Sequence, residues 1–464
     1  MKFLQKNKML GTLHMKSFRL LLSYNMGKLI LFIFCYFLLF FSYSQERYST
    51  SNKRALKYYF EAMESLKVRR FDDAIKQLKD AVGKDPKFTE AHFQLGILYK
   101  NYLRNVPGVK YHFGKILEAD SNFKNASVSR ILGEVYMREG NYPEARKLFT
   151  KYITFANEPE NFIEKSKRYI QQCDYAVEMI KHPVKVEYKK LPDHVNSHQK
   201  QYFPVTTADQ NNLVFTVRDR LMSTENEDIY LSQKNDLGEW SSPKSLSENI
   251  NTLKFNEGTC SISADGKVLA FTICGGKSRN DVDCDIYISY KEGEVWSKPE
   301  NLGPNVNSPY WDSQPSLSPD GKTLYFSSKR KGGLGEEDIW VVHADANGHW
   351  GNPLNMGDLI NTPGREVAPF IHPSMSTLYF ASDYHLGFGS FDLFVSYRDS
   401  INWNEPKNLG YPINTHLEES SIFITADCKK AYFSAEDKSG KETDRYFLYE
   451  FDLPKEASCK ETST

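Results

Sequence analysis

The chain has 464 residues, with 59 Lys and Arg against 59 Asp and Glu, so its formal net charge is zero. This balance, without any block of basic residues, argues against a nucleic-acid partner, and the length is sufficient for two domains. No Cys-x-x-Cys pair occurs among the seven cysteines. We therefore expect neither a metal site nor a cofactor.

Residues 1–44 have the pattern of a secretory signal peptide. They contain six basic and no acidic residues, and the apolar run 29–41 precedes small residues, with cleavage expected after Ser44. An uncleaved anchor is the alternative. Cleavage would leave 53 basic against 59 acidic residues. We expect an exported protein without a transmembrane span, in the periplasm or on the periplasmic face of the outer membrane, with the cell surface as an alternative.

Residues 45–182 are predicted to form a domain of helical repeats. Apolar and small residues recur with the helical period, and units begin at Ala55, Thr89 and Ala126, which are 34 and 37 residues apart. The first and third units resemble tetratricopeptide repeats, whereas the second departs from the pattern near Val106-Pro-Gly108. Residues 161–181 are expected to form a capping helix that ends before Pro183.

The first helix of each unit would line a concave groove, which suits an extended peptide or the terminus of a partner. The alternative is a solvated face, or a face that packs against the second domain. The candidate groove residues are Tyr59, Met63, Phe93, Lys100, Asn101, Arg130, Glu134 and Arg138.

Residues 183–455 carry a repeat marked by Trp240, Trp296, Trp350 and Trp403, which are 56, 54 and 53 residues apart. Each tryptophan precedes a proline and then an Ile/Val-Asn-Thr/Ser triplet. Each period holds four strand-like runs separated by turn residues. In the third copy these runs are 315–318, 323–328, 338–343 and 350–356. The pattern predicts a five-bladed β-propeller, with six blades as the fallback, followed by a tail at 456–464.

A second phrase, Asp-Ile-Tyr, recurs at Asp228, Asp285, Asp338 and Asp392, and more weakly at Asp444. We interpret these aspartates as acceptors of backbone N–H bonds that fix a hairpin, rather than as calcium ligands. The last copy lacks the tryptophan phrase, but residues 191–197 match its final part. The segment around 184–197 is therefore expected to supply the outer strand of the last blade and close the ring.

The innermost strand of each copy opens on an acidic or amide residue. Because innermost strands line the central channel, these side chains could ring one mouth and bind a cation, a basic peptide or glycan hydroxyls. The alternative is that each caps a loop in its own blade. The ring consists of Gln201, Glu257, Asp312, Glu366 and Glu418.

Cys274 and Cys284 flank a hairpin loop and are candidates for a disulfide, since export would bring the chain into an oxidising compartment. The remaining cysteines of the exported chain are expected to be buried or free thiols, namely Cys173, Cys260, Cys428 and Cys459. Only His194 and His198 stand at a helical spacing among the histidines, and no metal is expected there.

The sequence contains no nucleophile elbow, no His-Glu-x-x-His motif, and no Walker or Rossmann loop. The stretch Gly332–Gly335 falls in a predicted hairpin, where a turn is expected rather than a phosphate cradle. The sequence therefore predicts that the chain is not an enzyme.

The phrase Ser-Leu-Ser-Pro-Asp-Gly-Lys-Thr-Leu-Tyr-Phe-Ser-Ser from Ser316, with the later Asp338-Ile-Trp, resembles the WD40-like propeller repeat of TolB. Tetratricopeptide repeats followed by such a propeller are similar to the N-terminal half of OmpA-family envelope proteins of Bacteroidota, associated with type IX secretion and gliding. The resemblance implies a scaffold that assists secretion or outer-membrane integrity. Those proteins continue into a peptidoglycan-binding domain, whereas this chain stops soon after Leu453, so direct wall anchoring is not expected.

These observations together predict a non-enzymatic exported adaptor for protein–protein interactions at the bacterial envelope. Its expected partners are outer-membrane or secretion-machine components. One alternative is a propeller that binds glycans. Another is a propeller hydrolase or lyase in which two of the ring acids converge.

Overall fold

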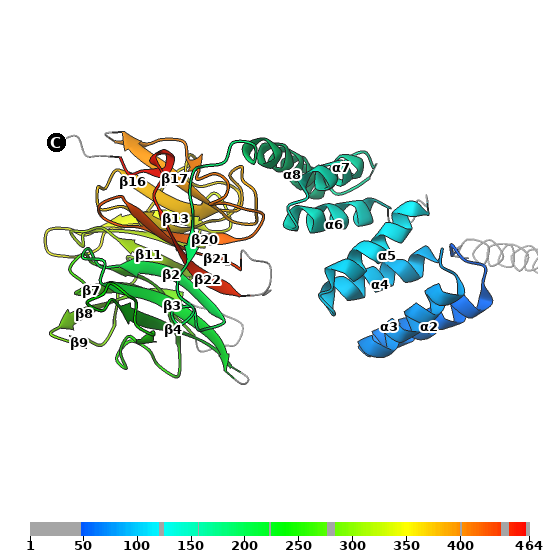
Figure 1. The fold of residues 1–464 in the computed structure, drawn as a ribbon, viewed down its shortest axis with the longest axis horizontal. Helices are drawn as coiled ribbons and strands as arrows, with labels where there is room; N and C mark the ends of the chain where they lie inside the picture. Colours follow the sequence, from blue (N-terminus) through cyan, green and yellow to red (C-terminus); the bar gives the residue numbers. More distant parts are fainter. Residues whose placement is uncertain are drawn as a thin grey trace, which may run out of the picture. The chain divides into compact units, whose positions relative to one another are not determined.

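The computed structural model describes residues 48–119, 125–155, 157–221, 224–275, 284–399, 401–437 and 445–460 (Figure 1). The predicted signal peptide at 1–44 lies outside the described residues. Within the described part, none of the helices combines the length and the apolar character that a membrane crossing needs. Cα packing divides the chain into two compact units, Met1–Asn125 and Ala126–Thr464.

The first unit holds four described helices that pack as consecutive pairs: α2 (Lys53–Lys67), α3 (Phe71–Lys84), α4 (Thr89–Asn101) and α5 (Val106–Glu118). The side chain of Asn52 caps α2 by accepting from the amides of Arg54 and Ala55. Gly96 allows α4 to approach α5, because a Cβ there would lie 2.2 Å from the ring of Phe113. The departure noticed at Val106-Pro-Gly108 is the start of α5.

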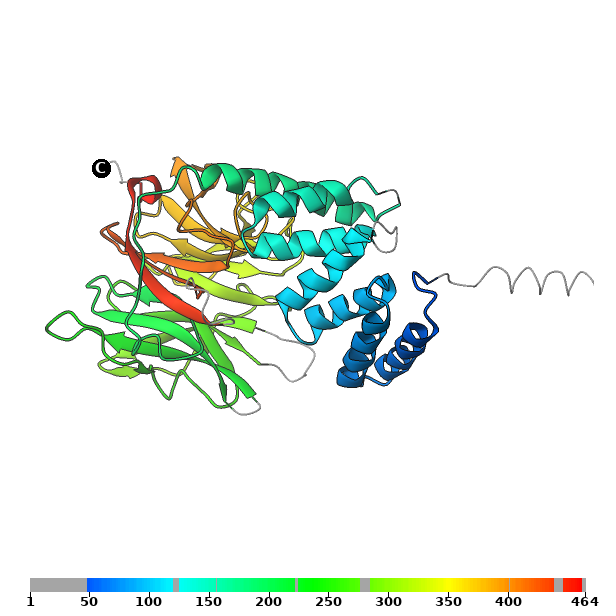
Figure 2. The same cartoon turned by 45° about the vertical axis from the view of Figure 1, so that its right-hand side comes forward.

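Three helices belong to the second unit: α6 (Asn125–Arg138), α7 (Tyr142–Tyr152) and α8 (Glu160–Met179). Figure 2 shows them along one side of the strand-rich body. The Tyr142 hydroxyl donates to the carbonyl of Phe388 (3.1 Å), and Gln172 Nε2 donates to the carbonyl of Gly389 (3.1 Å). Phe388 is fully buried in the same apolar cluster as Tyr142. Helices α6–α8 are thus packed with the strands, although the sequence places the domain boundary at 182/183.

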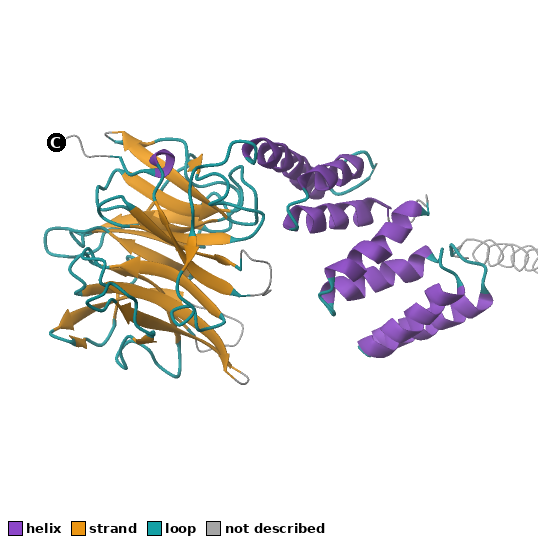
Figure 3. Ribbon diagram, viewed as in Figure 1, coloured by secondary structure: helices purple, strands orange, loops and turns teal. Residues whose placement is uncertain are grey.

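The strands follow the repeat, forming antiparallel groups in chain order (Figure 3). The first group is β2 (Lys200–Thr206), β3 (Asn212–Leu221), β4 (Thr224–Gln233) and β5 (Lys244–Ser245). The second is β6 (Asn256–Ile262), β7 (Val268–Cys274), β8 (Cys284–Glu292), β9 (Val295–Trp296) and β10 (Glu300–Asn301). The third is β11 (Asp312–Leu317), β12 (Thr323–Ser328), β13 (Asp338–His343) and β14 (Leu354–Asn355).

The next group is β15 (Glu366–Ile371), β16 (Thr377–Ser382), β17 (Asp392–Asp399), β18 (Asn402–Trp403) and β19 (Lys407–Asn408). The last is β20 (Glu419–Ile424), β21 (Lys430–Glu436) and β22 (Tyr446–Asp452), joined by β1 (Lys189–Lys190). The tail contains the short helix η1 (Lys455–Ala457). Strands β12 and β13 have the bounds that the sequence predicts.

The inner strands close a ring. In chain order β2 packs against β6, β6 against β11, β11 against β15 and β15 against β20, and β20 returns to β2. The fold is therefore a set of helices followed by a β-propeller.

Ring closure by the two ends of the strand region is confirmed. Strand β1 pairs antiparallel with β22, with Lys189 opposite Glu450. The Asn196 side chain accepts from the Leu448 amide (2.8 Å) and donates to the Leu448 carbonyl (3.0 Å). This contact also corrects the alignment of the fifth copy, in which the sequence places Asp444 at the position of the repeated aspartate. Leu448 takes the position that follows this aspartate in the other copies. Asp444 itself lies outside the described residues.

The same asparagine contact recurs in every other copy, where the asparagine of the triplet binds the backbone of the residue after the repeated aspartate. The pairs are Asn251 with Ile229, Asn307 with Ile286, Asn361 with Ile339 and Asn414 with Leu393. The repeat phrase therefore ties each outer connection to its third strand.

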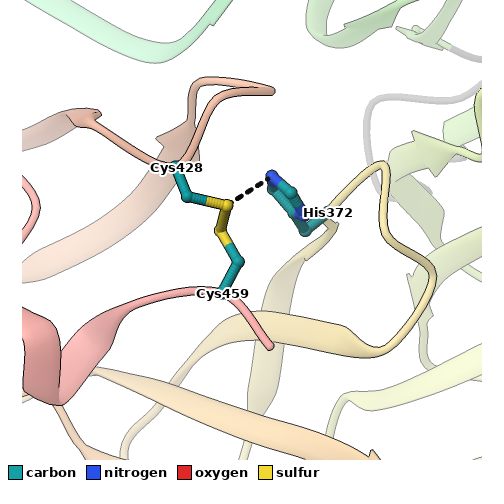
Figure 4. Close-up of side chains that lie close together, drawn as sticks. All are labelled: His372, Cys428 and Cys459. Carbon is teal, nitrogen blue, oxygen red and sulfur yellow. Dashed lines mark hydrogen bonds between the residues drawn. A yellow bond between two sulfur atoms is a disulfide. The ribbon is translucent and has the colours of Figure 1, made fainter. Parts of the chain in front are cut away.

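The cysteines form two disulfides among the described residues. Cys274 is bonded to Cys284 at the facing ends of β7 and β8, the pair that the sequence singles out. Cys428 is bonded to Cys459 (Figure 4), which corrects the expectation that these two are unpaired. The sequence does not indicate this second pair, because its cysteines are 31 residues apart and Cys459 reaches the β20–β21 turn only when the tail folds back. Cys173 and Cys260 are buried free thiols.

Candidate functional site: a charged and aromatic cavity at the propeller mouth

The predicted ring of acids is buried inside the blades. Gln201, Glu257, Asp312 and Glu366 are all 0% exposed. Glu366 shows the pattern: its carboxylate accepts from the amide (2.6 Å) and hydroxyl (2.7 Å) of Thr362 and from the Ser382 hydroxyl (2.7 Å). Each such side chain holds the loop before its own strand. This corrects the expectation that these four side chains surround a channel mouth.

The last copy is shifted by one residue. Glu419 is 0% exposed and accepts from the amide (3.0 Å) and hydroxyl (2.7 Å) of Thr415, as Glu366 does with Thr362. Glu419 is therefore the equivalent of the buried acids, and Glu418 precedes it. The Glu-Glu pair made this register ambiguous in the sequence.

Residues one position before the buried acids line a cavity of about 590 Å³. Successive side chains of a strand point to opposite sides, so a one-residue step moves a side chain from the blade interior to the channel. A second set lining the cavity stands two positions before the isoleucine or leucine of each third strand that the asparagine binds. The two sets are Lys200, Asn256, Trp311, Arg365 and Glu418, and Glu227, Cys284, Glu337, Phe391 and Tyr446. We call this space the mouth cavity.

A β-bulge in each inner strand shapes the floor of the mouth cavity. The strand register shifts after Tyr202, Gly258 and Ser313, and the next residues, Phe203 and Gln314 among them, have φ values of 53° and 58°. Such left-handed conformations are costly for residues other than glycine and cluster at functional sites. The bulges direct Phe203, Thr259 and Gln314 into the cavity.

Two carboxylates of the cavity are held by neighbouring donors. Glu227 accepts from the Tyr202 hydroxyl (2.7 Å) and lies 3.5 Å from Arg218. Glu337 pairs with Lys329 at 2.9 Å and lies 3.7 Å from Arg365. Both carboxylates are thereby fixed in place by their neighbours.

Glu418 has a different environment. Burial raises the pKa of Glu418, the like charge of Glu436 adds to this, and a hydrogen bond with Tyr446 opposes it. Burial together with Glu418 and Glu436 also raises the pKa of the Tyr446 hydroxyl. The mouth cavity thus contains one carboxyl whose pKa is raised by burial beside two that are held by cations or a hydroxyl.

Aromatic faces complete the cavity wall. Trp311 is half-buried, and the Lys329 ammonium lies 5.7 Å from its ring centroid. The Arg365 guanidinium lies 4.5 Å from the ring of Phe391 and is held by Asp383 at 2.7 Å. The Cys274–Cys284 disulfide borders the same space.

The predicted groove residues are divided between the two compact units. Tyr59 is 8% exposed and belongs to the core of the first unit, because it packs against Phe88. Met63 and Phe93 are half-buried, and Lys100 and Asn101 are exposed at the end of α4.

The remaining groove residues lie in the second unit. Arg130 pairs with Glu134 at 2.7 Å and lies over the ring of Phe162 at 4.5 Å. Glu134 and Arg138 line a cavity of about 270 Å³ between α6, α8 and propeller loops, which also includes Arg365. These side chains face the propeller, which is the alternative that the sequence left open.

The repeated aspartates bind loop backbone. Asp338 accepts from the Gly335 amide (2.9 Å) and from Asn355 (2.7 Å), and Asp392 accepts from the amides of Phe388 and Gly389 (both 3.0 Å). These bonds match the structural interpretation and include the glycine turn at 332–335. His194 Nε2 lies 2.7 Å from the carbonyl of Trp240.

The mouth residues Trp311, Arg365, Glu227 and Glu337 were not identified in the sequence. They come from separate strands, so no contiguous motif contains them. One signal was present: the copies carry similar residues at the buried acid position, but five different residue types immediately before it.

No family model matches this sequence, and no curated protein matches it either. Among solved structures, the chain is similar to a putative TolB from Agrobacterium tumefaciens, with 17% identity, 55% of this chain and 91% of that chain covered, and a TM-score of 0.29. A glycosyl hydrolase from Bacteroides ovatus gives 11% identity, 56% and 86% coverage, and a TM-score of 0.36. An α-L-arabinofuranosidase from Lactobacillus brevis gives 9%, 56% and 93%, and 0.37.

Most of these similar structures are glycoside hydrolases, which contradicts the prediction of a non-enzymatic protein-binding adaptor. That prediction, and the prediction that the chain is not an enzyme, are wrong and are not retained. Their basis was the absence of a linear catalytic motif, and a site assembled from several blades needs none. The low identities leave the function to be argued from the cavity itself.

Proposed function

We propose that the propeller binds a glycan in the mouth cavity. The proposal rests on the two sets of residues that line the mouth cavity, because their side chains differ from copy to copy in an otherwise repetitive propeller. The buried acids and the asparagine contacts recur from copy to copy, whereas the residues that face the cavity differ. A repeated scaffold with a non-repeated concave surface is suited to recognition.

The residue types fit a carbohydrate. Trp311 and Phe203 offer apolar faces to the C–H side of a sugar ring, and Glu227, Glu337 and Arg365 offer planar groups that can bind two hydroxyls at once. The carboxylates and cations are already held by their neighbours, which lowers the ordering cost on binding. The volume of about 590 Å³ can take a short oligosaccharide.

Substitution of Trp311 tests this proposal. We expect Trp311→Ala to weaken binding at least about tenfold without changing the melting temperature, because the ring is half-buried at the cavity wall. Binding would be screened on an array of neutral and acidic oligosaccharides, and the best one measured by calorimetry. Tyr310→Ala is the matched control, since this exposed aromatic neighbour lies outside the cavity lining. Absence of any bound glycan, or equal binding by Trp311→Ala, would overturn the proposal.

Glycoside hydrolysis is a second candidate, favoured by the unequal environments of the cavity carboxyls. Glu418, whose pKa burial raises, could donate a proton to a leaving glycosidic oxygen, while the Glu337 carboxylate is held 2.9 Å from Lys329. Such a pair of roles requires one acid and one carboxylate in the same cavity, and both line it.

Glu418→Gln separates hydrolysis from binding. If Glu418 is the acid, the variant should retain glycan affinity and lose turnover by roughly 10²- to 10⁴-fold on substrates with poor leaving groups. Reducing-end release from the glycan that the array identifies is the readout. Unchanged turnover in Glu418→Gln excludes this role. Binding without turnover in the unaltered protein leaves glycan capture as the function.

We further propose that the strand groups are five blades and that the helix pairs are tetratricopeptide repeats. The support is the ring of inner strands from β2 to β20, and the glycine contacts at Gly96 and Gly133, where a Cβ would meet Phe113 and Phe149. Export to the bacterial envelope, and the envelope partners implied by the resemblance, stay predictions.

A further inference from the structure

A second cavity adjoins the mouth cavity. It has a volume of about 270 Å³ and lies where α6 and α8 meet the propeller loops, and we call it the side cavity. Arg365 lines both cavities, and the consecutive residues Ser390 and Phe391 line the side cavity and the mouth cavity respectively. A ligand that fills the mouth cavity and extends past Arg365 would therefore enter the side cavity.

Each of the two helices contributes one face to the side cavity. Lys165, Arg168 and Gln172 line it from α8, and Glu134 and Arg138 line it from α6. Within each helix these residues are three or four positions apart, which is the spacing that places side chains on one face. Cations from both helices therefore converge on the same space.

The side cavity carries an excess of positive charge. Four cations line it against two carboxylates, and these residues are Arg138, Lys165, Arg168 and Arg365, and Glu134 and Asp383. Both carboxylates are already paired, Glu134 with Arg130 at 2.7 Å and Asp383 with Arg365 at 2.7 Å. Within the described residues, Arg138, Lys165 and Arg168 form no ion pair with a carboxylate. Such a cavity attracts an anion.

Two guanidinium groups of the side cavity are held in place before a ligand binds. Arg168 donates from Nη1 to the carbonyls of Asp383 and Tyr384 (both 3.1 Å) and lies 4.5 Å from the centroid of the Tyr384 ring. Arg365 donates from Nε to Asp383 Oδ2 at 2.7 Å. In the part of the chain that the structure describes, the other N–H groups of these two side chains make no hydrogen bond. They can donate to a carboxylate or a sulfate with little cost of ordering.

Gln172 adds a preference for a hydroxyl. This residue is 2% exposed, and its Nε2 donates to the Gly389 carbonyl (3.1 Å), whereas its Oε1 has no hydrogen-bond partner among the described residues. A buried acceptor without a donor is unfavourable, and a ligand hydroxyl at this wall of the side cavity would supply the donor. A sugar that carries an acidic group offers both the anion and the hydroxyl.

We propose that the glycan bound by the propeller is acidic, with a carboxylate or a sulfate on the sugar that enters the side cavity. This inference rests on the proposed function, because it assigns the charge of the glycan in the adjoining mouth cavity. Arg138, Lys165 and Arg168 bind the acidic group, and Gln172 accepts from a hydroxyl of the same sugar. An acidic peptide carries the same charge, so the test includes one.

An array of neutral, uronic-acid and sulfated oligosaccharides, with a polyglutamate peptide beside them, tests this inference. We expect the protein to bind an acidic glycan, and the class of that glycan distinguishes the carboxylate from the sulfate. Reduction of its carboxyl groups to alcohols, or removal of its sulfates, should weaken binding at least about tenfold, because the charge-assisted hydrogen bonds are lost. Added salt should also weaken the binding of the acidic glycan.

The double substitution Arg138→Gln with Lys165→Gln tests whether the side cavity binds the charge. Both side chains are exposed, so the melting temperature should not change. Affinity for the acidic glycan should fall at least about tenfold, and affinity for its neutralised form should stay the same. Lys147→Gln with Lys151→Gln is the matched control, since it removes the same charge from exposed positions of α7 that line none of the described cavities. Both affinities should be unchanged in this control.

The outcomes separate this inference from the proposed function. Binding of neutral glycans alone, or equal binding of the acidic glycan by the unaltered protein and by the Arg138→Gln, Lys165→Gln variant, would overturn the inference and leave glycan binding in place. Absence of any bound glycan overturns both, whether or not polyglutamate is bound. If the double variant does not fold, the comparison of the acidic glycan with its neutralised form on the unaltered protein decides instead.

Discussion

Arg365 and Glu366 are consecutive residues with opposite surroundings. Arg365 lines the mouth cavity and pairs with Asp383, whereas Glu366 is 0% exposed and accepts three hydrogen bonds from Thr362 and Ser382. A strand residue that points into the blade holds a loop, and its neighbour faces the mouth cavity. Substitutions of these two residues should therefore affect different properties.

Glu366→Gln should leave glycan binding unchanged and change the pH dependence of stability. Burial raises the pKa of Glu366 from its ordinary value of 4.5 to about 7, so between these pH values the folded state holds a proton that the unfolded state has lost. The stability that this carboxyl gives is complete below pH 4.5 and is lost as the pH rises to about 7. Gln keeps the same bonds, because hydroxyls can accept as well as donate.

Urea unfolding at pH 5 and pH 8 measures this effect. The free energy of unfolding of Glu366→Gln relative to the unaltered protein should rise between these pH values, by at most on the order of 3 kcal/mol. Glu366→Ala is the control for the hydrogen bonds: it also lacks the titrating carboxyl and should show the same change with pH, but its free energy of unfolding should lie about 1–3 kcal/mol below that of Glu366→Gln at both pH values, since it leaves the Thr362 amide unpaired. A pH-independent difference for Glu366→Gln would mean that the folded protein does not hold the proton.

At the scale of elements, the propeller is held by one asparagine contact repeated between each outer connection and its third strand. In the last group this contact crosses the two ends of the strand region, because Asn196 precedes β2 and Leu448 lies in β22. Asn196 also donates to the Leu191 carbonyl (2.9 Å) and accepts from Gln201 (2.7 Å). Asn196 is 4% exposed, so water cannot replace its hydrogen bonds when the side chain is removed.

Asn196→Ala should lower the free energy of unfolding by about 2–4 kcal/mol, because several buried groups lose their partner at the closure. Asn249→Ala is the matched control. Asn249 is exposed and its side chain donates only to the Trp296 carbonyl (2.7 Å) among the bonds described, so a loss within about 1 kcal/mol is expected. Chemical unfolding followed by tryptophan fluorescence gives both values. Equal losses in the two variants would show that closure does not depend on Asn196.

At the scale of the molecule, helices α6–α8 and the strands form one compact unit, separate from α2–α5. Phe388 connects them, since it is fully buried between Tyr142, Tyr175 and Tyr411. Arg168 adds bonds to the carbonyls of Asp383 and Tyr384 (both 3.1 Å). Asp383 also holds Arg365, so this contact supports the mouth cavity.

Two truncations distinguish the boundaries at 125/126 and 182/183. A chain that starts at Asn125 should unfold with the same strand transition as the longer protein. A chain that starts at Pro183 should unfold at a temperature several degrees lower, because Phe388 and the carbonyl of Gly389 lose their partners. Calorimetry of both chains is the measurement. A transition for the Pro183 chain that matches the Asn125 chain would support the boundary predicted from the sequence.

The sequence by itself determined the repeated strand groups, the closing segment before β2, and the pairing of Cys274 with Cys284. Each depends on local periodicity or on residues that flank one hairpin, and such patterns are fixed by backbone geometry. Only the tertiary structure decided which side chains face the channel, because a one-residue step reverses the face of a strand and Glu418-Glu419 permits either register. It also decided the mouth cavity and the Cys428–Cys459 pair, since both join residues from separate blades or from the tail, whose contacts no local pattern records.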